Sequence, residues 1–183
     1  MSLTALERLR HSVGVRLARW HFRNSHDEVI SFTNAISSAQ RVLLIMPLTA
    51  EDLLPTLQVL EMVRSQFKGE NITVVTGDRG VEAVRLLPRS QFLHLLKTQV
   101  SPLFLPRADF VKSVTQKRYD LAMDLNLDLV LPSGYICKVS GARIRVGFRH
   151  TQADVFYNFQ VRPDPTLGRK LIYDRFVQCL RKF

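Results

Sequence analysis

Short apolar runs of strand length alternate with longer amphipathic stretches along the middle of this chain. The runs at residues 41–46, 71–76 and 119–124 carry apolar side chains at consecutive positions rather than at alternate ones. Strands that are buried on both faces have this pattern, which favours a parallel sheet over an antiparallel one. Weaker strands are predicted at residues 91–95, 143–148 and 155–161.

The stretches between these strands have helical spacing. In residues 50–67 the large apolar side chains recur every three or four positions, which places them on one face of a helix. Further helices are predicted over residues 81–87, 108–117, 128–140 and 166–181, with a proline-containing loop at 101–107. Strands that alternate with helices of this length form right-handed βαβ units. We therefore expect one Rossmann-like α/β domain over residues 39–183, with a mostly parallel sheet and helices on both faces.

An amphipathic helix is also predicted near the start of the chain, within a helical extension over residues 1–38. Its apolar residues recur at steps of three and four: Leu3, Leu6, Leu9, Val13, Leu17 and Trp20. At about 100° per residue, four arginines gather on an adjacent arc: Arg8, Arg16, Arg19 and Arg23. The helix either lies on an anionic membrane surface with these arginines on the headgroups, or packs its apolar stripe on the domain or on a second subunit. Arg10 falls within the apolar arc, which favours packing.

The net charge of the chain indicates which classes of partner it favours. The sequence has 26 Lys+Arg against 16 Asp+Glu and a formal net charge of +10. Such an excess favours nucleic acid, an anionic membrane surface or a phosphorylated glycolipid as a neighbour. No basic-aromatic motif or recognition helix accompanies the charge, so nucleic acid is not expected.

The N-terminal charges and the short apolar runs also bear on location. Charged residues interrupt the first twenty positions, and the longest apolar run, at 42–48, is too short to cross a bilayer. We expect a cytoplasmic protein, with peripheral association at the inner membrane as the membrane-binding alternative.

The two cysteines and five histidines predict no metal or redox site. Cys137 and Cys179 fall in predicted helices without a CxxC spacing and are expected to be ordinary buried thiols. The histidines lack metal-ligand spacing, and no phosphate-binding glycine-rich loop or nucleophile elbow occurs. We therefore expect no metal and no cofactor.

Ligands of an open parallel sheet bind at the carboxyl ends of its strands, so the loop after the first strand is the first candidate. It reads Met46-Pro-Leu-Thr-Ala-Glu-Asp52 and lacks the glycines that let backbone amides approach a pyrophosphate. Thr49 and Asp52 have the spacing of a capping box, and Glu51 and Asp52 put negative charge where an anion would dock. This excludes a dinucleotide site. Asp52 is either a carboxylate that stabilises the helix start or a general base that faces the cleft, with Thr49 and Glu51 as candidate ligand contacts.

Polar residues also follow the other strands. Asp124, Asn126 and Asp128 cluster at the end of a buried strand, where they either cap the next helix or, for Asp124 and Asn126 above all, hydrogen-bond a ligand. The segment Gly77-Asp-Arg-Gly80 is expected to be a solvated turn, although an acidic residue after a second strand can also bind a ribose.

Three segments of the chain carry a resemblance to a known family. They read Tyr119-Asp-Leu-Ala-Met-Asp-Leu-Asn126, Lys138-Val-Ser-Gly-Ala-Arg143 and Ile144-Arg-Val-Gly-Phe148. This pattern resembles the "YDLxIDL … GAxxRxGF" stretch of the ADP-heptose:lipopolysaccharide heptosyltransferases, which are inverting glycosyltransferases of the two-domain GT-B architecture. The first strand and helix, and the segment from Phe156 to the last helix, are also similar to that family. The resemblance covers roughly residues 40–180.

The resemblance implies the acceptor-side half of such an enzyme. In the family, an aspartate at the start of the first helix is considered the base that deprotonates the acceptor hydroxyl, and Asp52 falls on that position. Met46 stands where the family has an arginine, and Glu51 where it has a glycine. The nucleotide-sugar domain of the family lies beyond the resemblance, so transfer by this chain alone is not expected.

These features lead to two expected functions. The first is binding of a sugar or glycolipid acceptor in cell-envelope polysaccharide assembly, together with a separate donor-domain partner or as a homo-oligomer. The alternative is a non-enzymatic, degenerate domain for oligomerisation or scaffolding.

Overall fold

A computed structural model describes residues 4–25, 27, 36–77 and 86–183. Within these residues, six strands form one parallel sheet in the order β3-β2-β1-β4-β5-β6. The strands are β1 (Val42–Ile45), β2 (Ile72–Thr76), β3 (Gln91–His94), β4 (Leu121–Asp124), β5 (Ile144–Phe148) and β6 (Phe159–Val161). The central strand β1 pairs with β2 on one side and β4 on the other, so that Ile45 lies opposite both Val75 and Asp124. The predicted α/β class is confirmed, and every strand pair is parallel.

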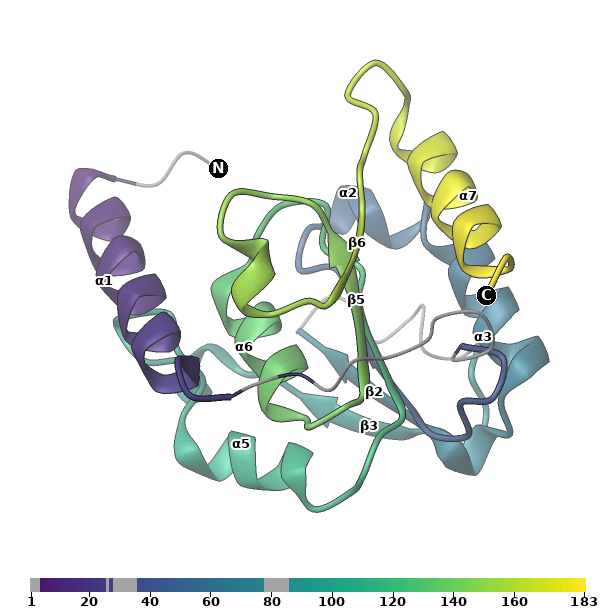
Figure 1. Cartoon of the computed structure of the whole chain (residues 1–183), viewed down its shortest axis with the longest axis horizontal. Coiled ribbons are helices and arrows are strands. Elements are labelled where there is room, and N and C mark those ends of the chain that lie inside the picture. The colour runs from purple at the N-terminus through teal and green to yellow at the C-terminus, as the bar shows by residue number, and fades with distance from the viewer. Residues whose placement is uncertain (1–3, 26, 28–35, 78–85) are drawn as a thin grey trace.

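Helices cover both faces of this sheet (Figure 1). On one face lie α3 (Leu57–Gln66) and α7 (Arg169–Leu180); on the other lie α1 (Ala5–Phe22), α5 (Ala108–Thr115) and α6 (Leu131–Val139). Strand β1 contributes to both apolar clusters, because Val42 and Leu44 face the first and Leu43 and Ile45 face the second. Burial on two faces is the physical reason for the continuous apolar run of this strand.

The helix predicted over residues 50–67 is broken into two. The short α2 (Ala50–Leu53) precedes Pro55, and α3 begins at Leu57. Proline has no amide hydrogen to donate to the carbonyl four residues back, so it interrupts the helical hydrogen-bond ladder. The chain resumes its helix only after a turn in which the Leu57 amide donates to the Leu54 carbonyl at 3.2 Å.

Other elements differ from the prediction only at their ends. The helix predicted from residue 128 starts at Leu131, next to Pro132, and the one predicted from residue 166 starts at Arg169. Only Phe159–Val161 of the stretch 155–161 is a strand, since residues 153–155 form a 3-10 turn.

The segments that carry the family resemblance form β4, α6 and β5, and two of their glycines have structural reasons. A Cβ at Gly147 would lie 2.7 Å from the ring of Tyr157, so only glycine leaves room for this side chain. Gly141 follows α6 with a φ of 68°, in the left-handed region that glycine adopts freely. Between them, Arg145 is buried, and its Nε donates to the Phe156 carbonyl at 2.9 Å. The pattern therefore fixes the segment around residues 156–157 against the sheet.

Helix α1 packs on the domain, but not through its apolar stripe. Its buried residues are Gly14, Val15 and Ala18, and the ring of Phe22 lies 4.9 Å from that of Tyr135 on α6. The small residues let the helix approach the domain closely: a Cβ at Gly14 would lie 2.0 Å from the carbonyl oxygen of Leu103. The described stripe residues are exposed instead. The prediction that the stripe packs on the domain is therefore wrong, because a different face of the helix fits more closely.

Some sequence predictions lie largely outside the described residues. These are the turn at 77–80, the helix at 81–87 and the later part of the helical extension over residues 1–38. In the part of the chain that the structure describes, no helix is long and apolar enough to cross a membrane.

Candidate functional site

The strand order reverses between β1 and β4, and the sequence-predicted site residues lie where these two strands end. The chain continues from β1 to β2 on one side, and from β4 to β5 on the other. In open α/β sheets ligands bind at this kind of switch point, at the carboxyl ends of the strands. Thr49, Glu51 and Asp52 follow β1, Asp124 ends β4, and Asn126 comes two residues later. The topology thus brings the five candidates to one edge of the sheet.

Asp52 is buried, and both of its carboxylate oxygens have partners. The hydroxyl of Thr49 donates to Oδ2, and Nη1 of Arg169, at the start of α7, donates to Oδ1. The predicted capping box is not formed, because the Thr49 side chain donates to the carboxylate instead of accepting from a backbone amide. A general base needs a carboxylate oxygen beside the proton that it takes. The carboxylate oxygens of Asp52 keep further lone pairs, but only 5% of the side chain is exposed, so little of it is open to a substrate hydroxyl.

Arg169 is the functional candidate that sequence reasoning missed. It pairs with Asp52 and also with Glu51, whose Oε2 lies 3.1 Å from Nη2. Its hydrogen bond to Asp52 is the main reason that the pKa of Arg169 is raised, so the side chain stays charged. Arg169 lies 117 residues after Asp52, and no local spacing connects them. The sequence pointed to Arg169 only through the predicted C-terminal helix that contains it, and the sequence pattern does not show where this helix packs on the sheet.

Asp124 is completely buried at the end of β4 and accepts three hydrogen bonds. The Tyr157 hydroxyl donates to one oxygen at 2.7 Å, and Asn126 donates to the other through its side-chain amide at 2.7 Å and its backbone amide at 3.0 Å. Burial raises the pKa of Asp124 to about 6, although these hydrogen bonds lower it. The carboxylate has no exposed surface, and its hydrogen bonds join Tyr157 and Asn126 to the end of β4.

Asn126 joins the end of β4 to the loop after β1. Its Oδ1 accepts from the Leu48 amide at 3.0 Å, and its Nδ2 also donates to Ser133 of α6 at 3.2 Å. The alternative that these residues cap the next helix is wrong, since the residue at the N-cap of α6 is Val130 and no side chain caps it. The polar cluster instead fixes the two loops at the switch point relative to each other.

One face of α7 contacts both parts of this edge. Tyr173 follows Arg169 by four residues, which places the two side chains on the same side of the helix. The Tyr173 ring is fully buried, and its hydroxyl donates to the Leu125 carbonyl just after β4 at 2.6 Å. Helix α7 therefore contacts α2 through Arg169 and the end of β4 through Tyr173.

Thr49, Glu51 and Arg169 are among the residues at this edge that are open to solvent. The side chains of Glu51 and Arg169 are 77% and 44% exposed. A carboxylate beside a guanidinium can hydrogen-bond the hydroxyl groups of a sugar, and the guanidinium can also pair with a phosphate.

Metal and thiol chemistry have no assembled site in the residues that the structure describes. No group of three or more His, Cys, Asp or Glu side chains in this part of the chain could hold a metal ion. Both cysteines are free. Cys137 is buried as expected, whereas Cys179 is only half-buried, because it lies towards the end of α7.

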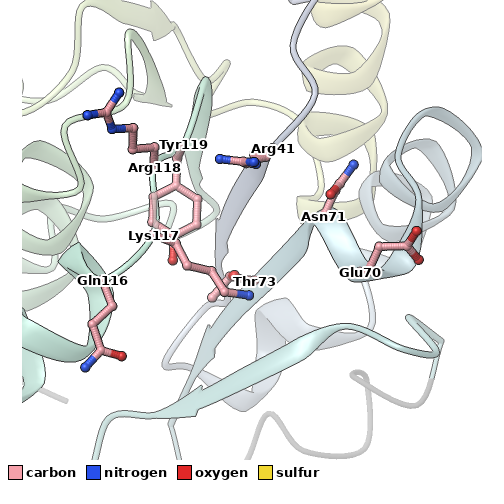
Figure 2. A pocket seen from close by; sticks show the side chains of 8 residues that line it. All are labelled: Arg41, Glu70, Asn71, Thr73, Gln116, Lys117, Arg118 and Tyr119. Carbon is pink, nitrogen blue, oxygen red and sulfur yellow. The ribbon is translucent and has the colours of Figure 1, made fainter.

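A pocket of about 400 Å³ lies at the opposite, amino-terminal edge of the sheet (Figure 2). Its lining includes Arg41, Glu70, Asn71, Lys117, Arg118 and Tyr119, which precede β1, β2 and β4. Three cations against one acidic residue make this pocket suited to a small anion. Burial of the Tyr119 ring raises its pKa. No sequence prediction covers this pocket, because most of its residues precede the strands and predicted sites follow them, although the Lys117-Arg118 pair was a signal.

The arginines predicted to contact a membrane or an anion belong to another surface. Arg8, Arg16, Arg19 and Arg23 are all exposed on α1. They line neither the switch-point edge nor the pocket of Figure 2.

The fold is a Rossmann-like α/β domain whose switch point lies between β1 and β4. Among solved structures, the chain is similar to the E. coli heptosyltransferase WaaC with ADP, with a TM-score of 0.57 and 16% sequence identity. The similarity covers 74% of this chain and 45% of that one, so the chain spans less than half of that enzyme's length. At this identity the likeness shows the fold alone. No protein-family model matches the chain, and no curated protein matches it in sequence.

Proposed function

We propose that this chain is a glycosyltransferase-like domain that binds a sugar-containing acceptor at the carboxyl ends of β1 and β4. The observation that carries the proposal is the bridge from Arg169 to both Glu51 and Asp52 at the switch point of a GT-B-type sheet. In this proposal the exposed Glu51 carboxylate accepts hydrogen bonds from sugar hydroxyls, and Arg169 donates to hydroxyl or phosphate oxygens.

The charge of the chain supports a phosphorylated acceptor. A net charge of +10 raises the local concentration of anionic ligands such as phosphorylated glycolipids. The domain would act in cell-envelope polysaccharide assembly on the cytoplasmic side of the inner membrane. A donor-binding domain would complete the cleft, because transfer needs both substrates in one geometry.

Titration with a soluble oligosaccharide tests this proposal. The probe is the phosphorylated core oligosaccharide of lipopolysaccharide, freed of its lipid so that membrane binding does not contribute, and the heat of binding is measured by calorimetry. We expect Arg169→Gln to weaken binding by about tenfold, since it removes a charge-assisted donor. The control is Arg175→Gln on the same helix, where the arginine pairs with Asp164 at 3.2 Å. No binding by the unmodified chain, or equal weakening by both variants, would contradict the proposal.

A second candidate is a non-enzymatic domain for assembly, and the state of Asp52 favours it. Both carboxylate oxygens are taken by Thr49 and Arg169, as in an aspartate with a structural role. The two candidates differ in the behaviour of Asp52→Asn. If Asp52 is only structural, Asp52→Asn lowers stability and the oligosaccharide does not change the stability of the unmodified chain. If the edge is an acceptor site, the oligosaccharide stabilises the unmodified chain against unfolding.

A further inference from the structure

Five large apolar side chains face solvent along one side of α1. They are Leu6, Leu9, Val13, Leu17 and Trp20, named here the α1 stripe, and the residues Leu9 and Trp20 are 62% and 63% exposed. Their spacing keeps them within an arc of roughly 80° on the helix. Single exposed apolar residues are ordinary, but a contiguous row along a helix marks an interaction surface.

The orientation of α1 is fixed by its other side. Gly14, Val15 and Ala18 are buried against the domain, and His11 and Phe22 contact Phe104 and Tyr135. Figure 1 shows α1 at the periphery of the molecule, outside α6. The packed face therefore holds the stripe outward.

Arginines border the α1 stripe on both sides. At about 100° per residue, Arg16 and Arg23 fall on one border and Arg10 on the other, and all three are exposed. The guanidinium of Arg23 lies 5.0 Å from the centre of the Trp20 ring. The acidic residue of this helix, Glu7, accepts hydrogen bonds from Thr4 in the N-terminal capping box instead of facing the stripe.

We propose that α1 docks this domain on an anionic membrane surface. The α1 stripe enters the boundary between headgroups and acyl chains, and the bordering arginines pair with lipid phosphates. Trp20 suits the headgroup level, where tryptophan rings concentrate. Arg10 extends its stem along apolar surface while its charge stays among the headgroups. This docking is independent of sugar binding at the switch point.

Charge favours a membrane over a second copy of the chain as the occupant. Two stripes packed together would bring the arginine borders of the two helices side by side, and such like-charge contacts disfavour association. An anionic lipid surface instead supplies a phosphate to each arginine.

The single tryptophan of the chain makes the proposal directly testable, because Trp20 lies in the stripe. The full chain is mixed with vesicles of phosphatidylcholine alone, or of phosphatidylcholine with phosphatidylglycerol. We expect a blue shift of Trp20 emission and co-sedimentation with the anionic vesicles, both decreasing as salt is added. Absence of both signals at low salt, or equal binding to the two vesicle types, overturns the proposal.

Variants separate the contributions of the stripe and its border. We expect Leu9→Ser/Leu17→Ser to weaken vesicle binding at least tenfold through lost apolar burial, and Arg16→Gln/Arg23→Gln to weaken it about tenfold or more. The control is Leu171→Ser, which changes an exposed leucine on α7 and leaves binding unchanged. All replaced side chains are exposed, so folding persists. Unchanged vesicle binding by Leu9→Ser/Leu17→Ser overturns the proposal. The proposal is also overturned if analytical ultracentrifugation without lipid shows a dimer of the unmodified chain that Leu9→Ser/Leu17→Ser dissociates.

Discussion

Arg169 at the start of α7 forms an ion pair with Asp52 of α2, across 117 positions of sequence. The contact ties the last helix of the chain to the loop that follows its central strand. Only 5% of the Asp52 side chain is exposed, whereas the arginine reaches solvent. A buried carboxylate depends on its partner more than an exposed one does, because it has lost the water that would otherwise solvate it.

We therefore expect Arg169→Met to lower the free energy of unfolding by about 1–3 kcal/mol, measured by urea denaturation. The loss arises because Asp52 keeps Thr49 as its partner but no longer has a compensating charge. Arg175→Met removes an exposed ion pair from the same helix and should change stability little. If the two variants behave alike, the Arg169–Asp52 contact does not stabilise the fold.

A pH dependence is expected from Asp124. Its folded pKa, about 6, lies above the ordinary value of 3.8, so the folded state holds the proton more tightly than the unfolded one. The protonated form therefore adds stability below about pH 4, and this contribution, roughly 3 kcal/mol for a shift of about two units, is lost as the pH rises through 6. Urea denaturation of the unmodified chain and of Asp124→Asn across this window measures it. The stability advantage of the unmodified chain should shrink as the pH rises, and parallel curves would refute this assignment.

Tyr157→Phe provides an internal check on the same carboxylate. The Tyr157 hydroxyl lowers the pKa of Asp124 by donating to it, so its removal should move the window to higher pH. A shift to lower pH would mean that another group dominates the titration.

The sheet could be predicted because its signal is local. In β1 every residue from Val42 to Ile45 is buried, and the unbroken apolar run in the sequence predicts this burial. The break at Pro55 could be predicted only in part. The missing amide hydrogen removes one helical hydrogen bond, but this alone does not determine whether the helix bends or ends. The orientation of α1 was not predictable. Either the small residues around Gly14 or the apolar stripe could pack on the domain, and which face packs depends on the position of the Leu103 carbonyl.

The same distinction applies to the candidate site. Asp52 and Asp124 could be found because Asp52 follows one recognisable strand and Asp124 ends another, and parallel strands end at one edge of the sheet. Arg169 and Tyr157, which hold these carboxylates, come from segments far away in sequence. Their partners are set by how α7 and the segment after β5 pack on the sheet, which no short-range spacing encodes.

Gly14→Ala tests the packing of α1 on the domain, because packing decides whether the substitution raises or lowers the free energy of unfolding. Alanine favours an isolated helix over glycine by up to about 1 kcal/mol, so an unpacked α1 would be stabilised. In the structure the new Cβ would lie 2.0 Å from a backbone oxygen, and the helix must move. We expect a net loss of about 1–3 kcal/mol in urea denaturation, with faster amide hydrogen exchange in α1. The control is Gly168→Ala at the N-cap of α7, where a Cβ meets nothing within 4 Å.

Gly147→Ala tests whether the glycine of β5 positions the Asp124 cluster. Its Cβ would lie 2.7 Å from the Tyr157 ring, whose hydroxyl donates to Asp124 from the other end of the same side chain. Displacing the ring should cost about 1–3 kcal/mol of stability and also weaken this hydrogen bond, which raises the pKa of Asp124 further. The second effect distinguishes a positioning role from simple overpacking. In the Tyr157→Leu background the ring is absent, so Gly147→Ala should then cost much less, a coupling that a double-mutant cycle measures. Equal costs in both backgrounds would show that the glycine serves the strand and not the cluster.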